Sequence, residues 1–91
     1  MKTETKNSQG EENMQVPVTK LKRGQSATVT QVNTDGKMFL RMCDIGIVPG
    51  SKIAYIAESP FKDPVYIAVR GTCFAVGLFH AKNIIVRPDV L

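Results

Sequence analysis

The sequence predicts a small, mainly β domain, a barrel or sandwich of about five short strands with one α-helix. Short runs rich in Val, Ile and aromatic residues are separated by Gly and Pro throughout the second half of the chain, and such punctuation is typical of small all-β folds. One segment, residues 37–45, has a helical period instead. With 91 residues, the chain has room for a single core.

The first predicted strand covers residues 27–32. Ala27 and Val29 lie on one face, whereas Val32 falls out of step with them. A change of phase within a strand indicates a bulge. We therefore expect a bulge near Gln31, which would bend the strand and help the sheet to close.

The predicted helix follows, between the first and second strands. Its apolar residues recur at i, i+4 and i+7 and form one helical face: Met38, Met42 and Ile45. Thr34 or Asp35 could accept hydrogen bonds from the free amides at its start. Gly46 follows its last turn, where a left-handed residue commonly ends a helix.

A tight turn and a second strand come next. Pro49 and Gly50 occupy the central positions of a predicted type II turn, in which the second residue needs a positive φ. The strand that begins at Lys52 alternates apolar side chains on both faces, with Ile53 and Tyr55 on one and Ile56 on the other. We expect this strand to be buried on much of both sides.

The last third of the chain predicts a hairpin, one helical turn and a final strand. Residues 65–76 alternate around Gly71, which marks the hairpin turn. Residues 78–82 suffice for one helical turn only. Ile84 and Val86 form the last strand, which Pro88 ends.

The first 15 residues predict a disordered tail, and residues 16–91 the folded domain. The tail is polar and without periodicity. Up to residue 16 it carries two lysines and three glutamates, which leaves ten basic and five acidic residues on the rest of the chain. No run of about 20 apolar residues is present, as a membrane-spanning helix would need, and no secretory signal is recognisable. We expect a cytoplasmic protein with no direct membrane insertion.

The chemistry-bearing residues are sparse. Cys43 and Cys73 have no metal-type spacing, and in a reducing compartment we expect two buried thiols rather than a disulfide. His80 is the only imidazole, and a tight transition-metal site usually needs three or four convergent ligands; a weak or adventitious site through His80 is the alternative. No catalytic triad, phosphate-binding loop or dinucleotide fingerprint appears. The sequence predicts a binding module with no catalytic residues, cofactor or metal site.

The centre of the chain resembles a known family. Residues 40–50, read as L-R-M-C-D-I-G-I-V-P-G, are similar to the R-L-x-x-L-G-hydrophobic-x-P-G signature of FeoA domains, the ferrous iron transport protein A family. The spacing on either side also fits, from Leu21 and Gly24 to the closing strand. The resemblance covers about residues 17–87.

This resemblance implies an SH3-like small barrel that supports FeoB, the membrane iron transporter with a GTPase domain, and it implies no catalytic residues. The positions of the signature are Gly46, Pro49, Gly50 and Gly71 in this chain, and local backbone geometry accounts for them. Arg41 is a candidate donor to a carboxylate of the transporter.

One departure from the family concerns Leu78 and Phe79, where charged residues are common. Two interpretations stay open: both side chains pack under the barrel end, or they form an apolar contact patch for a partner or a second copy of the chain.

A different class of function, binding of single-stranded nucleic acid, is the alternative. Lys20, Lys22 and Arg23 cluster before the first strand, and three aromatic residues could stack on bases: Tyr55, Phe61 and Tyr66. A nucleic-acid domain would usually be more basic than a net charge of +4, so this partner is disfavoured.

Overall fold

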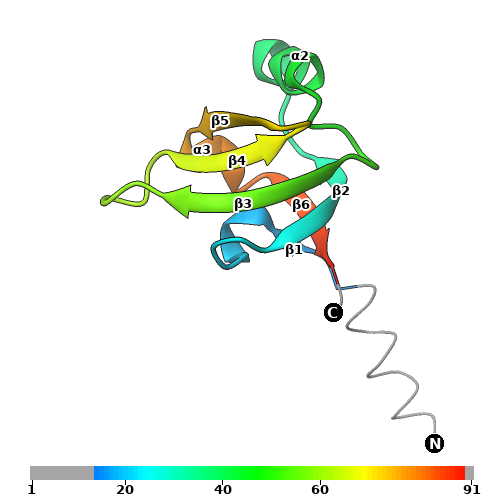
Figure 1. Cartoon of the computed structure of the whole chain (residues 1–91). Helices are drawn as coiled ribbons and strands as arrows, with labels where there is room; N and C mark the ends of the chain where they lie inside the picture. Colours follow the sequence, from blue (N-terminus) through cyan, green and yellow to red (C-terminus); the bar gives the residue numbers. More distant parts are fainter. Residues whose placement is uncertain (1–13, 90–91) are drawn as a thin grey trace, which may run out of the picture.

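A computed structural model describes residues 14–89 (Figure 1). The described chain forms one antiparallel sheet with the strand order β1-β6-β2-β3-β4-β5. The strands are β1 (Val16–Pro17), β2 (Ser26–Val32), β3 (Lys52–Glu58), β4 (Val65–Val69), β5 (Thr72–Val76) and β6 (Ile84–Pro88). The helices are the 3₁₀ turn η1 (Val18–Lys20), α2 (Gly36–Ile45) and α3 (Leu78–Ala81).

The mainly β class, the helix between the first two long strands and the helical turn before the last strand are confirmed. The sheet has six strands rather than about five, because the short strand β1 pairs with β6, Val16 opposite Val86 and Pro17 opposite Ile85. Two residues are too few to show a period. No helix of the described part is long and apolar enough to cross a membrane.

The predicted tail, residues 1–15, lies outside the described residues except for Met14 and Gln15, which are exposed. Gln15 accepts a hydrogen bond from the hydroxyl of Thr30 on β2, at 3.0 Å. The first regular element begins at Val16. The division of the chain at residue 16 stays a prediction.

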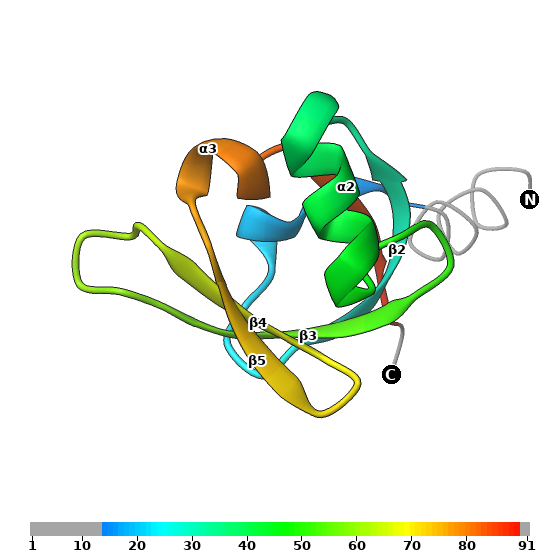
Figure 2. The ribbon, with the colours of Figure 1, turned by 90° about the horizontal axis from the view of Figure 1, so that it is seen from above.

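The sheet curls around an aliphatic core, and α2 and α3 lie at one end of it (Figures 1 and 2). The largest fully buried side chains come from every long strand except β5 and from the segments beside them: Val18, Val29, Ile47, Ile53, Val65, Ile67, Val69, Ile84 and Val86. No buried side chain of the described residues is polar or charged. Hydrophobic burial is therefore the main favourable term that holds the barrel together.

Two bulges give the sheet its curvature. The pairing of β2 with β6 shifts register between Val29 and Gln31, which confirms the bulge predicted there. A second shift lies in β3, between Tyr55 and Ala57. Ile56 sits at this bulge and is 43% exposed, so the expected burial of β3 on both faces is wrong. The bulge turns Ile56 towards solvent on the outer face of a curved sheet.

Helix α2 presents its predicted apolar face to the core, with Met42 buried and Met38 and Ile45 packed beside it. Its start differs from expectation, since Asp35 makes no side-chain capping bond and the buried hydroxyl of Thr34 has no hydrogen-bond partner. Gly36 enters the helix with a φ of 59°. We attribute the lost cap to this left-handed entry, which directs both side chains away from the first free amides.

The end of α2 is fastened more firmly. Gly46 has a φ of 97°, and the amide of Ile47 donates to the carbonyl of Met42 at 2.8 Å. Ile47 is fully buried. Three residues after Ile47, Gly50 adopts a φ of 95° and donates from its amide to the carbonyl of Val29 at 2.7 Å. Helix, turn and β2 are thus joined by backbone bonds as well as by packing.

The two cysteines are free and exposed, so the expectation of buried thiols is wrong. Cys43 is about 140° around the helix from Met38 on the usual 3.6-residue period, which puts it on the solvent side. Cys73 pairs with Ala68 on the β4–β5 hairpin, out of step with the buried Ile67 and Val69. In each case the period of the element, and not the hydrophobicity of the thiol, decides exposure.

The predicted β4–β5 hairpin is confirmed, with Val65 opposite Val76 and Val69 opposite Thr72. Arg70 and Gly71 form its turn, with φ angles of 55° and 80°. The Arg70 side chain folds back over Gly46, where an added Cβ would lie 3.3 Å from the guanidinium and 3.3 Å from a methyl group of Val69.

Replacing Gly46 with Ala is expected to lower the free energy of unfolding by about 2 kcal/mol, because the left-handed φ alone costs an L-residue about 1–2 kcal/mol and the methyl group also crowds Arg70 and Val69. Gly50→Ala is the matched control, since its φ is also positive but nothing lies within 4 Å of its Cβ position. Urea unfolding measures both. Equal losses in the two variants would contradict the role of the Arg70 contact.

Candidate functional site

A groove between α2 and α3 is the most developed concave surface that the predicted site residues share. It consists of two adjoining hollows of about 340 Å³ and 60 Å³. Met38 of α2 and His80 of α3 line both. We call it the α2–α3 groove and define it by six of its residues: Asp35, Met38, Arg41, Phe74, Phe79 and His80.

The α2 wall follows from the helical period. Met42 and Ile45 hold the helix against the core, which leaves Met38 half-buried at the groove and Arg41 exposed beside it. The floor of the smaller hollow is β5, through Phe74 and its neighbours. One wall is therefore a methionine and a guanidinium, and the floor is aromatic and aliphatic.

The α3 wall is a single helical turn with fixed ends. The amide of Leu78 donates to the Asp63 carboxylate at 2.9 Å, and the amide of Ala81 donates to the carbonyl of Gly77 at 2.8 Å. Asn83 donates from its side-chain amide to the carbonyl of Phe79 at 3.2 Å. A helix this short has little stability of its own, so these bonds set the direction of its side chains.

Phe79 is the most exposed groove residue among the large apolar side chains, at 69%. Its ring meets the His80 ring edge to face, with centroids 5.3 Å apart. The Lys82 ammonium lies 6.0 Å from the Phe79 ring centroid, near the limit of a cation–π contact. The groove rim thus combines an aromatic ring, an imidazole and nearby cations.

Of the three predicted contact residues, Arg41 and Phe79 border this groove and Leu78 does not. Leu78 packs against the core and lines a different hollow with Tyr55 and Val65. Phe79 alone is exposed, so the two side chains do not form one patch. Whether any of the three contacts a partner stays a prediction.

Sequence reasoning missed Met38 and His80 as groove residues. The helical period predicts Met38 on the core face of its helix, and no pattern in the sequence predicts where His80 lies. They come from elements about 40 residues apart, and nothing local in the sequence tells that these elements meet.

None of the signature positions lines the groove. Gly46, Pro49 and Gly50 follow α2 and fix where the helix ends, whereas Gly71 forms part of the turn of the β4–β5 hairpin. The first three therefore contribute to the orientation of the α2 wall.

Residues 14–89 contain no group of three or more His, Cys, Asp or Glu that could hold a metal ion. His80 lines the larger hollow together with Asp35, Met38 and Phe79, and one imidazole with one carboxylate is fewer than the three or four ligands that a tight transition-metal site usually has.

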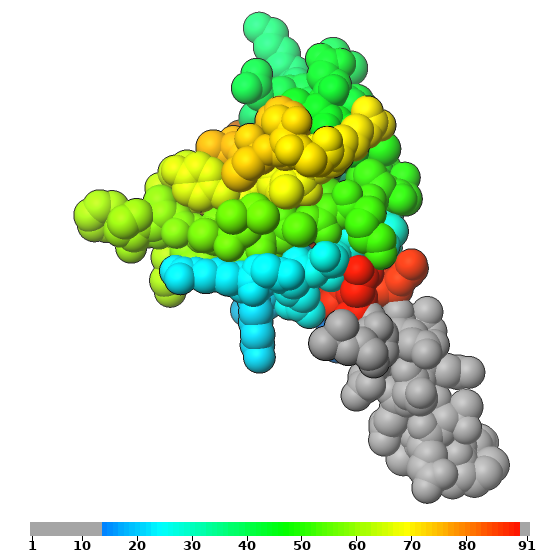
Figure 3. Space-filling model, viewed as in Figure 1, coloured from blue at the N-terminus to red at the C-terminus, as the bar shows by residue number. Residues whose placement is uncertain are grey.

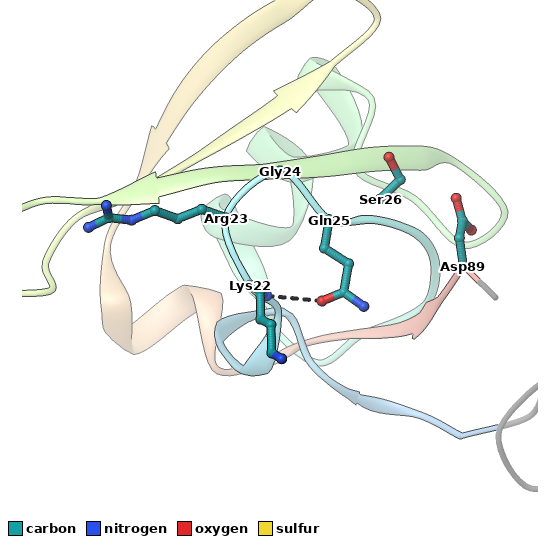
Figure 4. A pocket seen from close by; sticks show the side chains of 6 residues that line it. All are labelled: Lys22, Arg23, Gly24, Gln25, Ser26 and Asp89. Atoms are coloured by element: carbon teal, nitrogen blue, oxygen red, sulfur yellow. Dashed lines mark hydrogen bonds between the residues drawn. The ribbon is translucent and has the colours of Figure 1, made fainter. Parts of the chain in front are cut away.

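A larger hollow, of about 530 Å³, lies at the start of β2, but its side chains do not converge (Figure 4). Arg23 extends along β3 and pairs with Glu58 at 3.6 Å, while Lys22 points away from the sheet. Asp89 accepts from Lys52 at 2.8 Å. Arg23 and Asp89 are paired with residues outside the hollow, and Lys22 points away from it. The charged side chains therefore do not converge on a common ligand position.

The stacking surface required by nucleic-acid binding is not present in the predicted form. Tyr55 is 4% exposed, and its hydroxyl donates to the Glu58 carboxylate at 2.8 Å. Tyr66 is half-buried on β4, and only Phe61 is freely exposed. A buried tyrosine cannot offer its face to a base, so this assignment of Tyr55 is wrong.

The Tyr55–Glu58 pair has perturbed ionisation. Burial, and next the hydrogen bond to Glu58, raise the pKa of Tyr55 from 10.0 to about 12. The same hydrogen bond lowers the pKa of Glu58. The fold thus favours a neutral phenol beside an ionised carboxylate.

Comparison with known proteins gives the family. The model of the FeoA domain matches residues 16–88. The chain belongs to the FeoA family. No curated protein is similar enough in sequence to count as a match.

Solved structures of FeoA proteins are similar to this chain. The solution structure of FeoA from Chlorobium tepidum has 27% identity and a TM-score of 0.78, over 82% of this chain and 71% of that one. The crystal structure of an iron uptake regulatory protein, FeoA, has 26% identity and a TM-score of 0.73, over 84% and 99%.

A third, the zinc complex of Stenotrophomonas maltophilia FeoA, has 24% identity and a TM-score of 0.67, over 79% of this chain and 93% of that one. That protein is described as a prokaryotic SH3 domain protein. The expectation of an SH3-like fold is therefore confirmed, and the FeoA family is one of small SH3-like accessory domains.

Tyr55 should ionise near pH 12 in the folded chain. Because the folded pKa is raised, the contribution of the neutral phenol to stability is complete below pH 10 and is lost as the pH rises to about 12. Ultraviolet titration of Tyr66→Phe, which keeps Tyr55 as the single tyrosine, measures this. Glu58→Ala in that background should lower the pKa but leave it above 10.0, because burial is the larger cause. Titration of Tyr55 at its ordinary value would refute the assignment.

Proposed function

We propose that this FeoA-family chain is a non-enzymatic accessory protein of ferrous iron transport that binds the cytosolic part of a FeoB-type transporter through the α2–α3 groove. The proposal combines the family, whose domain model spans residues 16–88, with one feature of the surface. That feature is Phe79, a large aromatic side chain in an exposed position against His80, in the groove that Arg41 also lines.

Phe79 has the character of a binding anchor. Aromatic residues and arginine dominate the energetics of protein interfaces, and an exposed ring that its own helix holds in place loses little conformational entropy on binding. The hollow next to Phe79, about 340 Å³ in volume, could receive a side chain of the partner in return.

Arg41 can fix the orientation of the bound partner. Its side chain is exposed on α2, and a guanidinium can donate two parallel hydrogen bonds to one carboxylate. The folded part of the chain is basic, with ten Lys and Arg against five Asp and Glu after residue 16. An acidic surface on the cytosolic part of the transporter therefore fits this groove best.

A cytoplasmic location and a role without catalysis belong to the same proposal. The larger hollow holds two titratable side chains, His80 and Asp35, which are not hydrogen-bonded to each other, whereas acid–base catalysis relies on groups within hydrogen-bond reach of the proton that they move. Binding a transporter requires only the surface. A second copy of the chain is the competing occupant, and gel filtration of the chain alone detects it.

The test is a pull-down of the cytosolic part of a FeoB-type transporter by the full chain, with and without guanine nucleotide. Phe79→Ser should weaken binding about tenfold, as loss of an aromatic anchor does. Arg41→Glu should also weaken binding, and the loss should be larger at low salt than at high salt, because the contact is electrostatic.

Matched controls lie outside the groove. Arg87→Glu reverses an exposed cation on β6 that lines neither hollow, and Leu40→Ser changes an apolar side chain of α2 that is 63% exposed and about 200° around the helix from Met38. Both should bind normally. If Phe79→Ser and Arg41→Glu also bind normally, the groove is not the contact surface; if the unmodified chain is not retained at all, the partner is wrong.

A further inference from the structure

The loop between β3 and β4, residues 59–64, projects from the molecule. In Figures 1 and 3 it forms the yellow-green tip on the left. Phe61 lies in this loop and is 91% exposed, more than any other large apolar side chain of the described residues. A phenylalanine ring this exposed does not contribute the stabilisation that burial would bring. This makes Phe61 a candidate for contact with another surface.

The loop holds Phe61 in a fixed position. The amide of Lys62 donates to the carbonyl of Ser59 at 2.7 Å, and the amide of Ser59 donates to the carbonyl of Pro64 at 3.0 Å. The amide of Asp63 donates to the Ser59 hydroxyl at 3.0 Å. Phe61 is therefore displayed on a hydrogen-bonded turn whose backbone has little conformational freedom to lose on binding.

Cations lie at the base of this projection. Lys62 follows Phe61 directly, and it lines a hollow with Thr19 and Leu21 of the segment before β2. That segment carries three more exposed cations: Lys20, Lys22 and Arg23. The hollow shows that the basic segment and the base of the loop are neighbours, as the views in Figures 1 and 2 agree.

The acidic groups near the projection are already engaged. Glu58 pairs with Arg23 at 3.6 Å and accepts from Tyr55. Asp63 accepts from the amide of Leu78. With four cations against these two carboxylates, the local charge is positive. An apolar tip with a positive base complements a surface that is anionic outside and apolar beneath.

We propose that the β3–β4 loop is a peripheral membrane-contact site, with Phe61 entering the boundary between headgroups and acyl chains of an anionic bilayer and Lys20, Lys22 and Lys62 facing the headgroups. This proposal revises the sequence-based expectation of no direct membrane insertion. Aromatic side chains favour the interfacial region of a bilayer, and each nearby lysine adds attraction to anionic lipid. A single ring and a few cations give weak, reversible attachment.

Single-stranded nucleic acid fits the same residues less well. Stacking proteins bind successive bases on several exposed rings, whereas Tyr55 is buried and Tyr66 is half-buried on β4. Phe61 stands alone at a tip. A lone ring on a projection needs no matching partner in a bilayer, so lipid is the occupant that the arrangement favours.

The test is sedimentation of the full chain with vesicles of phosphatidylcholine alone and of phosphatidylcholine mixed with phosphatidylglycerol. Binding should require the anionic lipid and fall as salt is added. Phe61→Ser should lower the partition coefficient about tenfold. Lys62→Glu should lower it roughly fivefold or more, since one favourable charge is lost and a repulsive one is added.

Two exposed residues of α2 serve as matched controls, Leu40→Ser for the apolar change and Lys37→Glu for the charge reversal, and both should sediment like the unmodified chain. Equal sedimentation of Phe61→Ser and the unmodified chain, or no sedimentation with anionic vesicles, overturns the proposal. Phe61-dependent binding of a single-stranded oligonucleotide without vesicle binding also overturns it and assigns the tip to nucleic acid.

This inference does not rest on the proposed function. The vesicles contain no transporter, and the pull-down contains no lipid, so either experiment can fail while the other succeeds. If both succeed, the Phe61 loop and the α2–α3 groove are two separate contacts of one domain.

Discussion

The structure depends on how the chain leaves α2 and enters β3. Gly46 takes a left-handed conformation, Ile47 is fully buried, and Gly50 donates to the Val29 carbonyl. These residues connect the only long helix to the sheet, so they set its angle to the barrel. Because α2 supplies one wall of the α2–α3 groove, a backbone constraint at three positions governs a surface that none of them touches.

The position of α3 is likewise set by residues outside the helix. A four-residue helix has no independent stability, and its position comes from Gly77, from the Asp63 carboxylate and from the packing of Leu78 on the core. Asp63 belongs to the β3–β4 loop. The loop that carries Phe61 therefore also holds the helical turn that carries Phe79, through the bond between Asp63 and the Leu78 amide.

The exposure of a large apolar side chain follows its place on its element. Those on the inward phase of a strand or helix, such as Ile67 and Met42, are buried, and those on the outward phase, such as Leu40 and Ile56, are exposed. Phe61 and Phe79, the two most exposed among the described residues, lie in a loop and on a single helical turn, where no neighbouring element covers them. A domain of this size has a limited core, and exposed rings on supported turns give it contact surfaces without loss of core packing.

The sequence by itself determined the elements whose signals are local. The period of Met38, Met42 and Ile45, the phase change before Val32, the hairpin around Gly71 and the FeoA signature all come from neighbouring residues, and the helix, the bulge, the hairpin and the family agree with them. Periodicity and turn chemistry act over a few residues, which is why they can be read from one chain.

Only the tertiary structure decided which surfaces meet. It paired Val16 with β6, exposed both cysteines and Ile56, buried Tyr55 against Glu58, and brought Met38 and His80 into one groove while it turned Leu78 away. Each outcome depends on the curvature of the sheet and on contacts between residues far apart in sequence. Such contacts have no local signature, because side-chain chemistry alone does not say which element will lie opposite.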